Sequence, residues 1–272
     1  MSVVVENLTV KFKLQGRVSV PVRGVSLKLE KGSRVAIVGE SGSGKSLTAL
    51  SIGGLLERAE ISGNIKCDMK LAYVFQNPMA SLNPVMKVGR QISEAKSCDE
   101  TVEQLLESVG LSADAAKKYP CELSGGQCQR VMIAMALAQS PDLLIADEPT
   151  TALDVTTQKE ILELIDAIAK RRSMAVLLIT HNLGIVEDHC DYVYVMYAGE
   201  VVEQGRVERI MSLPYHPYTR GLLAAIPRID APKGAALADI PGTVPPAWNW
   251  PKGCAFAPRC PYRDKMPECR AL

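Results

Sequence analysis

The chain contains 272 residues, of which 47% are hydrophobic and 22% charged, and its formal net charge is +1. This length can bury a full hydrophobic core, and the composition is ordinary for a globular protein. The weak net charge argues against nucleic acid or an acidic membrane surface as a bulk electrostatic partner. No apolar run approaches the roughly 18 residues that span a bilayer, and no signal-peptide pattern opens the sequence.

The first 30 residues are predicted to form antiparallel β-strands. Apolar and polar residues mostly alternate over residues 3–5, 8–12 and 25–29, which is typical of half-buried strands. Gly16 and Pro21 are expected to make the turns between them. Phe12 has two interpretations: a core aromatic residue, or a platform on which an adenine ring stacks.

A glycine-rich loop follows the apolar, β-branched run at residues 34–38. The loop matches the pattern G-x-x-x-x-G-K-[ST] at every fixed position, with the residues Gly39, Glu40, Ser41, Gly42, Ser43, Gly44, Lys45 and Ser46. Leu47, which begins a helical pattern, is counted with this site. A strand, a loop and a helix in this order aim backbone N–H groups at one polyphosphate. Lys45 would reach the β- and γ-phosphates and Ser46 would ligate Mg²⁺. The sequence therefore predicts a nucleoside triphosphate site.

A strand is expected to begin near residue 63, and another covers residues 71–75 and ends at Gln76. Residues 77–84 contain two prolines and two asparagines, which favours a loop. Apolar residues at helical spacing around Leu105 then predict a helix, and Gly110 fits its end.

A Leu-Ser-Gly-Gly-Gln segment opens a helix that is apolar on nearly all sides; its residues are Leu123, Ser124, Gly125, Gly126 and Gln127. The free N–H groups at that helix N-terminus and the Ser124 hydroxyl would suit an anion. Considered alone, a plain Gly-Gly turn before a core helix explains the pattern better.

Two carboxylates end an apolar strand that starts at residue 143. A buried strand would deliver Asp147 to Mg²⁺ beside the phosphate loop, and Glu148 would orient or deprotonate the attacking water. The alternative, a helix-capping aspartate and a solvated glutamate, does not explain why both follow a fully apolar strand.

Asp154 is expected to cap the next helix. Residues 174–179 form another parallel-type strand, which leads to His181. Because ligands bind at the carboxyl ends of strands in doubly wound sheets, three strand ends would bring the phosphate loop, the carboxylates and this histidine to one edge. Residues 193–203 are predicted to form a closing hairpin with its turn at residues 198–199.

Prolines recur from Pro214 onward, which predicts an irregular tail rather than a second cored domain. The tail holds three of the eight cysteines: Cys254, Cys260 and Cys269. The other five are interpreted as small hydrophobic residues, and their scatter argues against a disulfide framework. These five are Cys67, Cys98, Cys121, Cys128 and Cys190.

Together these segments resemble the nucleotide-binding subunit of an ATP-binding-cassette (ABC) transporter over about residues 3–205. The family's motifs occur in the family's order: Walker A at residues 39–46, the Q-loop at Gln76, the signature at 123–127, Walker B with its catalytic glutamate at 143–148, the D-loop at Asp154 and the switch histidine at His181. The resemblance implies an α/β fold, an ABC-type P-loop NTPase with a mixed β-sheet core, an antiparallel N-terminal β subdomain, a helical signature subdomain and an irregular C-terminal tail. The nucleotide-binding domain would cover residues 1–213, with its helical subdomain at about 83–140, and the tail would cover residues 214–272.

The resemblance also implies roles for single residues. The catalytic residues would be Glu148, His181 and Lys45. The Mg²⁺ ligands would be Ser46, Gln76 and Asp147, and Phe12 would stack on the adenine of ATP.

A head-to-tail dimer with an identical or a different ABC ATPase subunit follows from the same resemblance. Each ATP would lie between the Walker A motif of one subunit and the signature of the other, so Ser124, Gly125 and Gly126 would cradle the γ-phosphate bound by the partner. With the resemblance, a binding role for residues 123–127 is therefore preferred over a plain Gly-Gly turn. Closure on ATP, hydrolysis and reopening would drive two transmembrane permease subunits, with Gln76 coupling the site to them. The chain would bind peripherally at the cytoplasmic face of the inner membrane, with an extracytoplasmic binding protein as an indirect partner and no nucleic acid.

A narrower resemblance is to the peptide and nickel importer branch of the family. It rests on the Q-loop segment at 76–84, on His-Pro-Tyr-Thr at 216–219 and on the cysteine-bearing residues 253–262. The expected function is therefore ATP hydrolysis that energises import of oligopeptides, dipeptides or nickel. The alternatives are the ATPase of another transporter branch and a soluble ABC ATPase acting on ribosomes or DNA.

In some members of this branch, four tail cysteines bind a [4Fe–4S] cluster. This chain supplies three, Cys254, Cys260 and Cys269. A cluster, a zinc site and free thiols are all compatible with that number.

Overall fold

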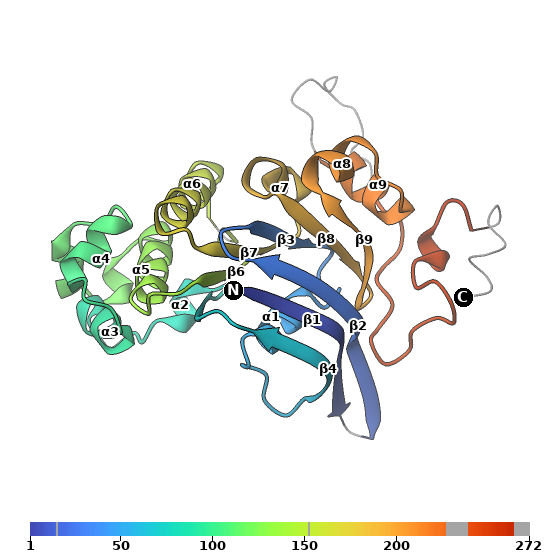
Figure 1. Cartoon of the computed structure of the whole chain (residues 1–272), viewed down its shortest axis with the longest axis horizontal. Coiled ribbons are helices and arrows are strands. Elements are labelled where there is room, and N and C mark those ends of the chain that lie inside the picture. Colours follow the sequence, from blue (N-terminus) through green and yellow to red (C-terminus); the bar gives the residue numbers. More distant parts are fainter. Residues whose placement is uncertain (15, 152, 227–238, 264–272) are drawn as a thin grey trace. The chain divides into compact units, whose positions relative to one another are not determined.

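The computed structural model describes residues 1–14, 16–151, 153–226 and 239–263. The chain divides into two compact units, and Figure 1 labels their helices and strands. The first unit contains Met1–Ser2, Leu29–Arg34 and Asp68–Ile179. The second unit contains Val3–Lys28, Val35–Cys67 and Thr180–Leu272.

In the first unit, three parallel strands lie in the order β5-β6-β7. They span Leu71–Val74 (β5), Leu143–Asp147 (β6) and Ala175–Thr180 (β7). Every residue of β6 and β7 is buried, which explains why these strands are apolar runs rather than alternating patterns. Asp147 lies opposite Ile179 in the β6–β7 register.

Helix α5, Gly125–Leu137, is the central helix of this unit. It packs against α2 (Pro78–Ser81), α3 (Val88–Ala95), α4 (Val102–Ser108) and α6 (Val155–Arg172). Eight of its thirteen residues are buried, so the prediction of a buried helix is confirmed.

Two predictions for the first unit have different outcomes. The helix predicted around Leu105 is α4, and Gly110 follows its end with a φ of 74°, as expected for a helix-terminating glycine. The loop predicted over residues 77–84 is wrong in part, because α2 lies within it. Asn77 caps that helix by accepting a hydrogen bond from the Ala80 N–H at 3.2 Å, and Pro78 suits the first helical position.

The second unit contains a three-stranded sheet in the order β2-β1-β4. Its strands are Ser2–Leu14 (β1), Arg17–Glu30 (β2) and Glu60–Cys67 (β4), and β1 runs antiparallel to β4. The turn at Gly16 is confirmed. The turn predicted at Pro21 is wrong, because Pro21 lies inside β2. A strand accepts proline where its N–H is not needed in the ladder, and the preceding Val20 N–H donates to the Ala247 carbonyl of the tail instead.

The same unit contains a mixed set of three strands, β3-β8-β9. They span Arg34–Val38 (β3), Tyr192–Tyr197 (β8) and Glu200–Arg206 (β9); β3 and β8 are parallel, whereas β8 and β9 are antiparallel. The predicted hairpin is confirmed. Both residues of its turn, Ala198 and Gly199, have positive φ values of 50° and 85°, which matches the twist of the flanking strands.

The helices of the second unit are short. They are Lys45–Ile52 (α1), Leu183–His189 (α7), Val207–Ser212 (α8) and Pro217–Ala224 (α9), with a 3-10 turn at Ala257–Arg259. The described tail is mostly irregular, as expected, but it is packed: Tyr218, Phe256 and Arg259 are all buried. The Phe256 ring centroid lies 5.2 Å from that of Tyr197 on β8.

The cysteines outside the tail do not share one environment. Cys128 and Cys190 are buried, Cys67 and Cys98 are half-buried, and Cys121 is exposed. The interpretation as a small hydrophobic residue is therefore wrong for Cys121, which lies in a short 3-10 turn before α5. Burial, and then the neighbouring Cys121, raise the pKa of the Cys128 thiol, which keeps Cys128 protonated and inert.

Candidate functional site

The phosphate loop leaves β3 and enters α1 with its backbone pressed against two neighbouring strands. A Cβ atom at Gly39 would overlap the carbonyl oxygen of Met196 on β8, and one at Gly44 would lie 2.6 Å from the carbonyl oxygen of Pro21 on β2. Gly44 also has a φ of 98°, which side chains rarely adopt. The glycines of the motif are thus required by packing as well as by the turn.

Lys45 begins α1 with its ammonium group folded over the loop. Its Nζ donates hydrogen bonds to the carbonyl oxygens of Gly39 at 2.7 Å and Glu40 at 3.0 Å. The Lys45 residue is 5% exposed. The charge is therefore held inside the loop, at the place where the motif predicts a phosphate.

The other loop residues differ in exposure. Ser41 and Gly42 are exposed, and Ser46 and Leu47 are half-buried. The Ser43 hydroxyl is buried, and within the described part of the chain it has no hydrogen-bond partner. An orphaned hydroxyl in a phosphate loop fits a ligand that brings hydrogen-bonding oxygens.

Asp147, the last residue of β6, accepts a hydrogen bond from the Tyr73 hydroxyl at 2.8 Å. Asp147 is 6% exposed. Burial, and then the nearby Asp147 carboxylate, raise the pKa of Tyr73, so the phenol remains a donor at neutral pH. No local pattern in the sequence marks Tyr73, because its role depends on the pairing of β5 with β6.

Glu148 follows β6 with a φ of 44°. This left-handed conformation costs a non-glycine residue about 1–3 kcal/mol, and the Glu148 N–H is tied to the Ile179 carbonyl at 2.9 Å. Its Oε2 accepts hydrogen bonds from Gln76 Nε2 at 2.9 Å and from the Thr151 hydroxyl at 2.8 Å. The structure therefore brings Gln76 to Glu148, as neighbours in one site, and adds Thr151, which the sequence analysis missed.

At the start of α5, Ser124 and Gln127 form a capping box. The Ser124 Oγ accepts from the Gln127 N–H at 3.3 Å, and the Gln127 Oε1 accepts from the Ser124 N–H at 3.0 Å. Gly126 has no room for a side chain, because a Cβ would lie 2.7 Å from the Thr157 methyl group. Ser124 and Gly125 are exposed. The helix N-terminus is thus preformed and reachable from solvent.

Asp154 caps α6, as predicted. Its carboxylate accepts from the Thr157 N–H at 3.0 Å and from the Thr157 hydroxyl at 2.7 Å, and these bonds lower the pKa of Asp154. His181 is exposed just after β7, and Phe12 is half-exposed on β1. Phe12 is therefore not a fully buried core residue.

The predicted site residues divide between the two units. Phe12, the phosphate loop and His181 lie in the second unit, whereas Gln76, the signature, the two carboxylates and Asp154 lie in the first. The phosphate loop is held by contacts within the second unit, and Asp147 and Glu148 are held by contacts within the first.

The tail cysteines do not form a metal site in the described part of the chain, where no group of three or more His, Cys, Asp or Glu residues could hold a metal ion. Cys254 and Cys260 are half-buried free thiols, and the Cys260 sulfur accepts from the Tyr262 N–H at 3.4 Å. Cys269 lies outside the described residues. Two described thiols do not fit a cluster that takes four protein ligands, so the [4Fe–4S] cluster, one of the three states that the sequence left open, is unsupported.

Comparison with known proteins explains this set of motifs. Residues 22–151 match the family model described as "ABC transporter", and residues 202–269 match "Oligopeptide/dipeptide transporter, C-terminal region". The oligopeptide transport ATP-binding protein AppD of Bacillus subtilis (strain 168) is 44% identical, over 97% of this chain and 89% of the relative. The chain belongs to the ABC transporter family. The dipeptide transport ATP-binding protein DppD of the same organism is also 44% identical, over 95% of this chain and 86% of that protein.

Solved ABC structures have the same fold. A dimeric ATP-binding cassette in a post-hydrolysis state, bound to ADP and Pi, matches with a TM-score of 0.66 and 27% identity, over 75% of this chain and 98% of that one. An inward-facing metal-chelate type ABC transporter matches with a TM-score of 0.68 and 25% identity, over 82% of this chain and 88% of that one. The predicted ABC-type P-loop fold is confirmed.

Membership of the ABC family settles the coarse biochemistry. An ABC ATP-binding subunit hydrolyses ATP with Mg²⁺, so the predicted ATPase activity is confirmed. Dimeric ATPases and permease partners are likewise implied for such a subunit. No helix in the described ranges is long and apolar enough to cross a membrane.

Proposed function

We propose that this chain is the ATP-hydrolysing subunit that energises an importer of oligopeptides or dipeptides. The observation that carries the proposal is the match of residues 202–269 to the C-terminal region of oligopeptide and dipeptide transporters, next to a complete set of ABC motifs. Relatives with 44% identity are named for transport of these peptides. Residues 1–213 would be the nucleotide-binding domain and residues 214–272 its tail.

The phosphate loop would bind the triphosphate of ATP. Its backbone N–H groups and the N-terminus of α1 suit the phosphate oxygens, and the Lys45 ammonium would move from the Gly39 and Glu40 carbonyls to the β- and γ-phosphates. Ser46, Asp147 and Gln76 would hold Mg²⁺, which neutralises phosphate charge when bound. Phe12 would stack on the adenine.

Glu148 would orient and deprotonate the attacking water. Its strained backbone and the two hydrogen bonds to Oε2 restrict the carboxylate to one orientation, which is how positioning accelerates phosphoryl transfer. Gln76 touches this carboxylate directly, so a movement of the Q-loop would reach the reacting water. His181 would contribute to stabilising the transferring phosphoryl group.

A second ABC ATPase subunit would complete each site. In a head-to-tail dimer that closes on ATP, Ser124, Gly125 and Gly126 would face the γ-phosphate held by the partner. The exposure of Ser124 and Gly125 supports this role, and Gly126 is half-buried. The capping box uses a lone pair of the Ser124 hydroxyl as acceptor, and the hydroxyl proton can still be donated to a phosphate oxygen.

The segment around Gln76, residues 75–85, is our candidate for the permease contact. Three large apolar side chains near the Q-loop are exposed: Phe75 at 41%, Met79 at 49% and Val85 at 83%. Exposed apolar side chains gathered in one short segment suit a protein interface. The chain would thus be held peripherally at the cytoplasmic face of the membrane, beneath two permease subunits that receive peptides from an extracytoplasmic binding protein.

Purification of the chain from its native host, in mild detergent, tests this assembly. We expect two permease subunits and an ABC ATPase partner in the complex, and ATP hydrolysis that rises when a peptide-loaded binding protein is added. Recovery of ribosomes or DNA instead of a permease pair would contradict the importer. Stimulation of ATP hydrolysis by nickel and not by peptides would contradict the assignment of peptides as the substrate.

The Lys45→Ala variant tests the site within that complex. We expect it to lose most nucleotide binding while remaining folded, because the buried ammonium is the loop's positive charge. Lys159→Ala is the matched control, since Lys159 is an exposed lysine on α6 whose ammonium lies 3.8 Å from Glu163. If Lys45→Ala binds nucleotide as the native chain does, the phosphate loop is not the ATP site.

A further inference from the structure

Arg259, in the 3-10 turn of the tail, reaches the phosphate loop. Its Nη1 donates to both carboxylate oxygens of Glu40, at 3.1 and 3.0 Å. Glu40 is the second residue of the loop and lies 219 positions earlier in the sequence. An ion pair therefore joins the C-terminal tail to the predicted ATP-binding motif within the second unit.

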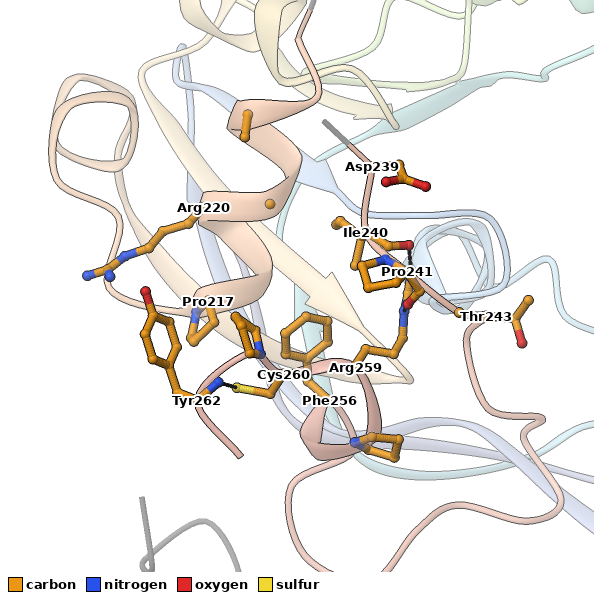
Figure 2. A pocket seen from close by; sticks show the side chains of 15 residues that line it. Pro217, Arg220, Asp239, Ile240, Pro241, Thr243, Phe256, Arg259, Cys260 and Tyr262 are labelled. Carbon is orange, nitrogen blue, oxygen red and sulfur yellow. Dashed lines mark hydrogen bonds between the residues drawn. The ribbon is translucent and has the colours of Figure 1, made fainter. Parts of the chain in front are cut away.

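The guanidinium group of Arg259 is fixed on the tail side as well. Its Nε donates to the Pro241 carbonyl at 2.8 Å, and its Nη2 donates to the Ile240 carbonyl at 2.9 Å. Figure 2 shows the Arg259 side chain beside Phe256 and directed toward Pro241, next to a cavity of about 780 Å³ that α9 and later parts of the tail line together. Two tail segments thus hold one cation in a single orientation.

Burial makes the charges of this ion pair costly unless each has its partner. The Arg259 side chain is 5% exposed and that of Glu40 is 29% exposed. Burial on its own would lower the pKa of Arg259, but its Tyr197 and Glu40 partners raise that pKa overall. A buried cation is costly unless it is paired and hydrogen-bonded, so the carboxylate of Glu40 is strongly constrained to this place.

Glu40 is attached at three points. Besides its carboxylate, its N–H donates to the Tyr218 hydroxyl at 2.8 Å, and its carbonyl accepts from Lys45 at 3.0 Å. Tyr218 is fully buried in α9, against the rings of Tyr197 and Phe256. One residue therefore links the tail, through its side chain and its amide, to the lysine of the phosphate loop.

We propose that Arg259 is a positioning residue for ATP binding, which acts through Glu40 to set the conformation of the phosphate loop. The C-terminal tail is then a working part of the nucleotide site. This inference rests on the phosphate loop being the ATP site, as proposed above. Arg259 itself contacts neither the phosphates nor the reacting water; it acts on the carbonyl of Glu40, where Lys45 is anchored.

A double-mutant cycle on the full chain tests the inference, with a fluorescent ATP analogue and Mg²⁺ as the ligand. Arg259→Ala and Glu40→Gln each remove the ion pair between Arg259 and Glu40, so each should weaken binding about tenfold. The double variant should also lose about tenfold rather than the product of the two, because the residues act as one unit. Arg263→Ala, an exposed arginine on the same tail, should bind as the native chain does.

Steady-state kinetics in the assembled transporter separate positioning from a loss of folded protein. Misplacement of the loop should raise KM for MgATP about tenfold in either single variant and change kcat much less. Glu40→Gln keeps the tail and Arg259 intact, so it stays informative if Arg259→Ala folds poorly. A lower kcat with an unchanged KM, or additive losses in the double variant, would overturn the proposal.

Lys45→Ala serves as the reference for the site itself. If it abolishes nucleotide binding while Arg259→Ala and Glu40→Gln bind normally, only the positioning role is wrong. If Lys45→Ala binds normally, the site assignment fails and the proposal fails with it.

Discussion

The phosphate loop and the Glu148 turn each follow a buried strand, yet they are held in place by different means. The loop is fixed by its backbone: Gly39 and Gly44 lie against the carbonyls of two other strands, and the Gly199 N–H donates to the Ser43 carbonyl at 3.0 Å. The Glu148 N–H is also tied to the Ile179 carbonyl, but the Glu148 carboxylate is held by the side chains of Gln76 and Thr151.

This difference reflects what each segment does: the loop must have a fixed backbone path, and Glu148 must have an oriented side chain. A loop that must present many N–H groups to a polyphosphate needs a defined backbone path, which glycine and close packing provide. A carboxylate that must act on one water needs a fixed orientation of its side chain, which hydrogen bonds from other side chains provide. Substitutions in the loop should therefore alter stability and binding, and substitutions around Glu148 should alter turnover.

The strongest test is Glu148→Gln. It removes the base but keeps the shape of the side chain, so we expect kcat for ATP hydrolysis to fall by about 10²–10⁴ with nucleotide affinity retained. Phosphate release and equilibrium nucleotide binding measure the two quantities. Glu163→Gln, at an exposed glutamate on α6, is the matched control. Normal ATP turnover by Glu148→Gln would show that Glu148 is not the catalytic carboxylate.

Two alanine substitutions test the backbone role of the loop. Gly39→Ala places a methyl group on the Met196 carbonyl and should lower the free energy of unfolding by about 3 kcal/mol. Gly42→Ala meets open space but has a φ of 80°, so it should cost about 1 kcal/mol from backbone strain alone. Thermal denaturation compares the two variants. Equal losses would show that close packing does not fix the loop.

Thr151→Val probes the side-chain support of Glu148. It removes a hydroxyl that donates to the carboxylate at 2.8 Å, and a hydrogen bond to a charged group contributes about 1.5–3 kcal/mol. We expect kcat to fall about tenfold without a change in nucleotide affinity. Thr151→Ser keeps the hydroxyl and should retain most activity. A drop in nucleotide affinity rather than in kcat would show that Thr151 contributes to nucleotide binding instead of to catalysis.

Acid pH should weaken the support of the loop through His216. Its Nδ1 accepts the Tyr218 N–H at 3.1 Å and caps α9. Burial lowers the pKa of His216, and the Glu203 carboxylate opposes that shift. Because the folded pKa lies below the unfolded value of about 6.5, the unfolded state binds more protons in that window, so stability falls as the pH drops from about 6.5 through the folded pKa.

The expected loss is up to about 1.4 kcal/mol for each pH unit in that window. His216→Asn keeps a capping oxygen and does not titrate, so its melting temperature should fall less than that of the native chain between about pH 7.5 and about pH 5.5. An equal fall in melting temperature for the native chain and for His216→Asn would exclude His216 as the titrating group.

Local patterns in the sequence determined the motifs and most of the elements. The cap of α6 at Asp154, the end of α4 at Gly110 and the hairpin turn at residues 198–199 depend on partners within a few positions, and the spacing of its glycines and lysine alone identifies the phosphate loop. Backbone conformation and short-range hydrogen bonds decide such features. They could therefore be predicted before any packing was known, and so could the order of the ABC motifs.

The tertiary structure decided the contacts that join distant segments. Pro21 lies in a strand because β2 has an edge there, and Cys121 is exposed because its turn lies outside the core. Gln76 and Glu148 are 72 positions apart, and Glu40 and Arg259 are 219 apart. No local propensity encodes such pairs, because they form only when packed strands and buried rings bring separate parts of the chain together.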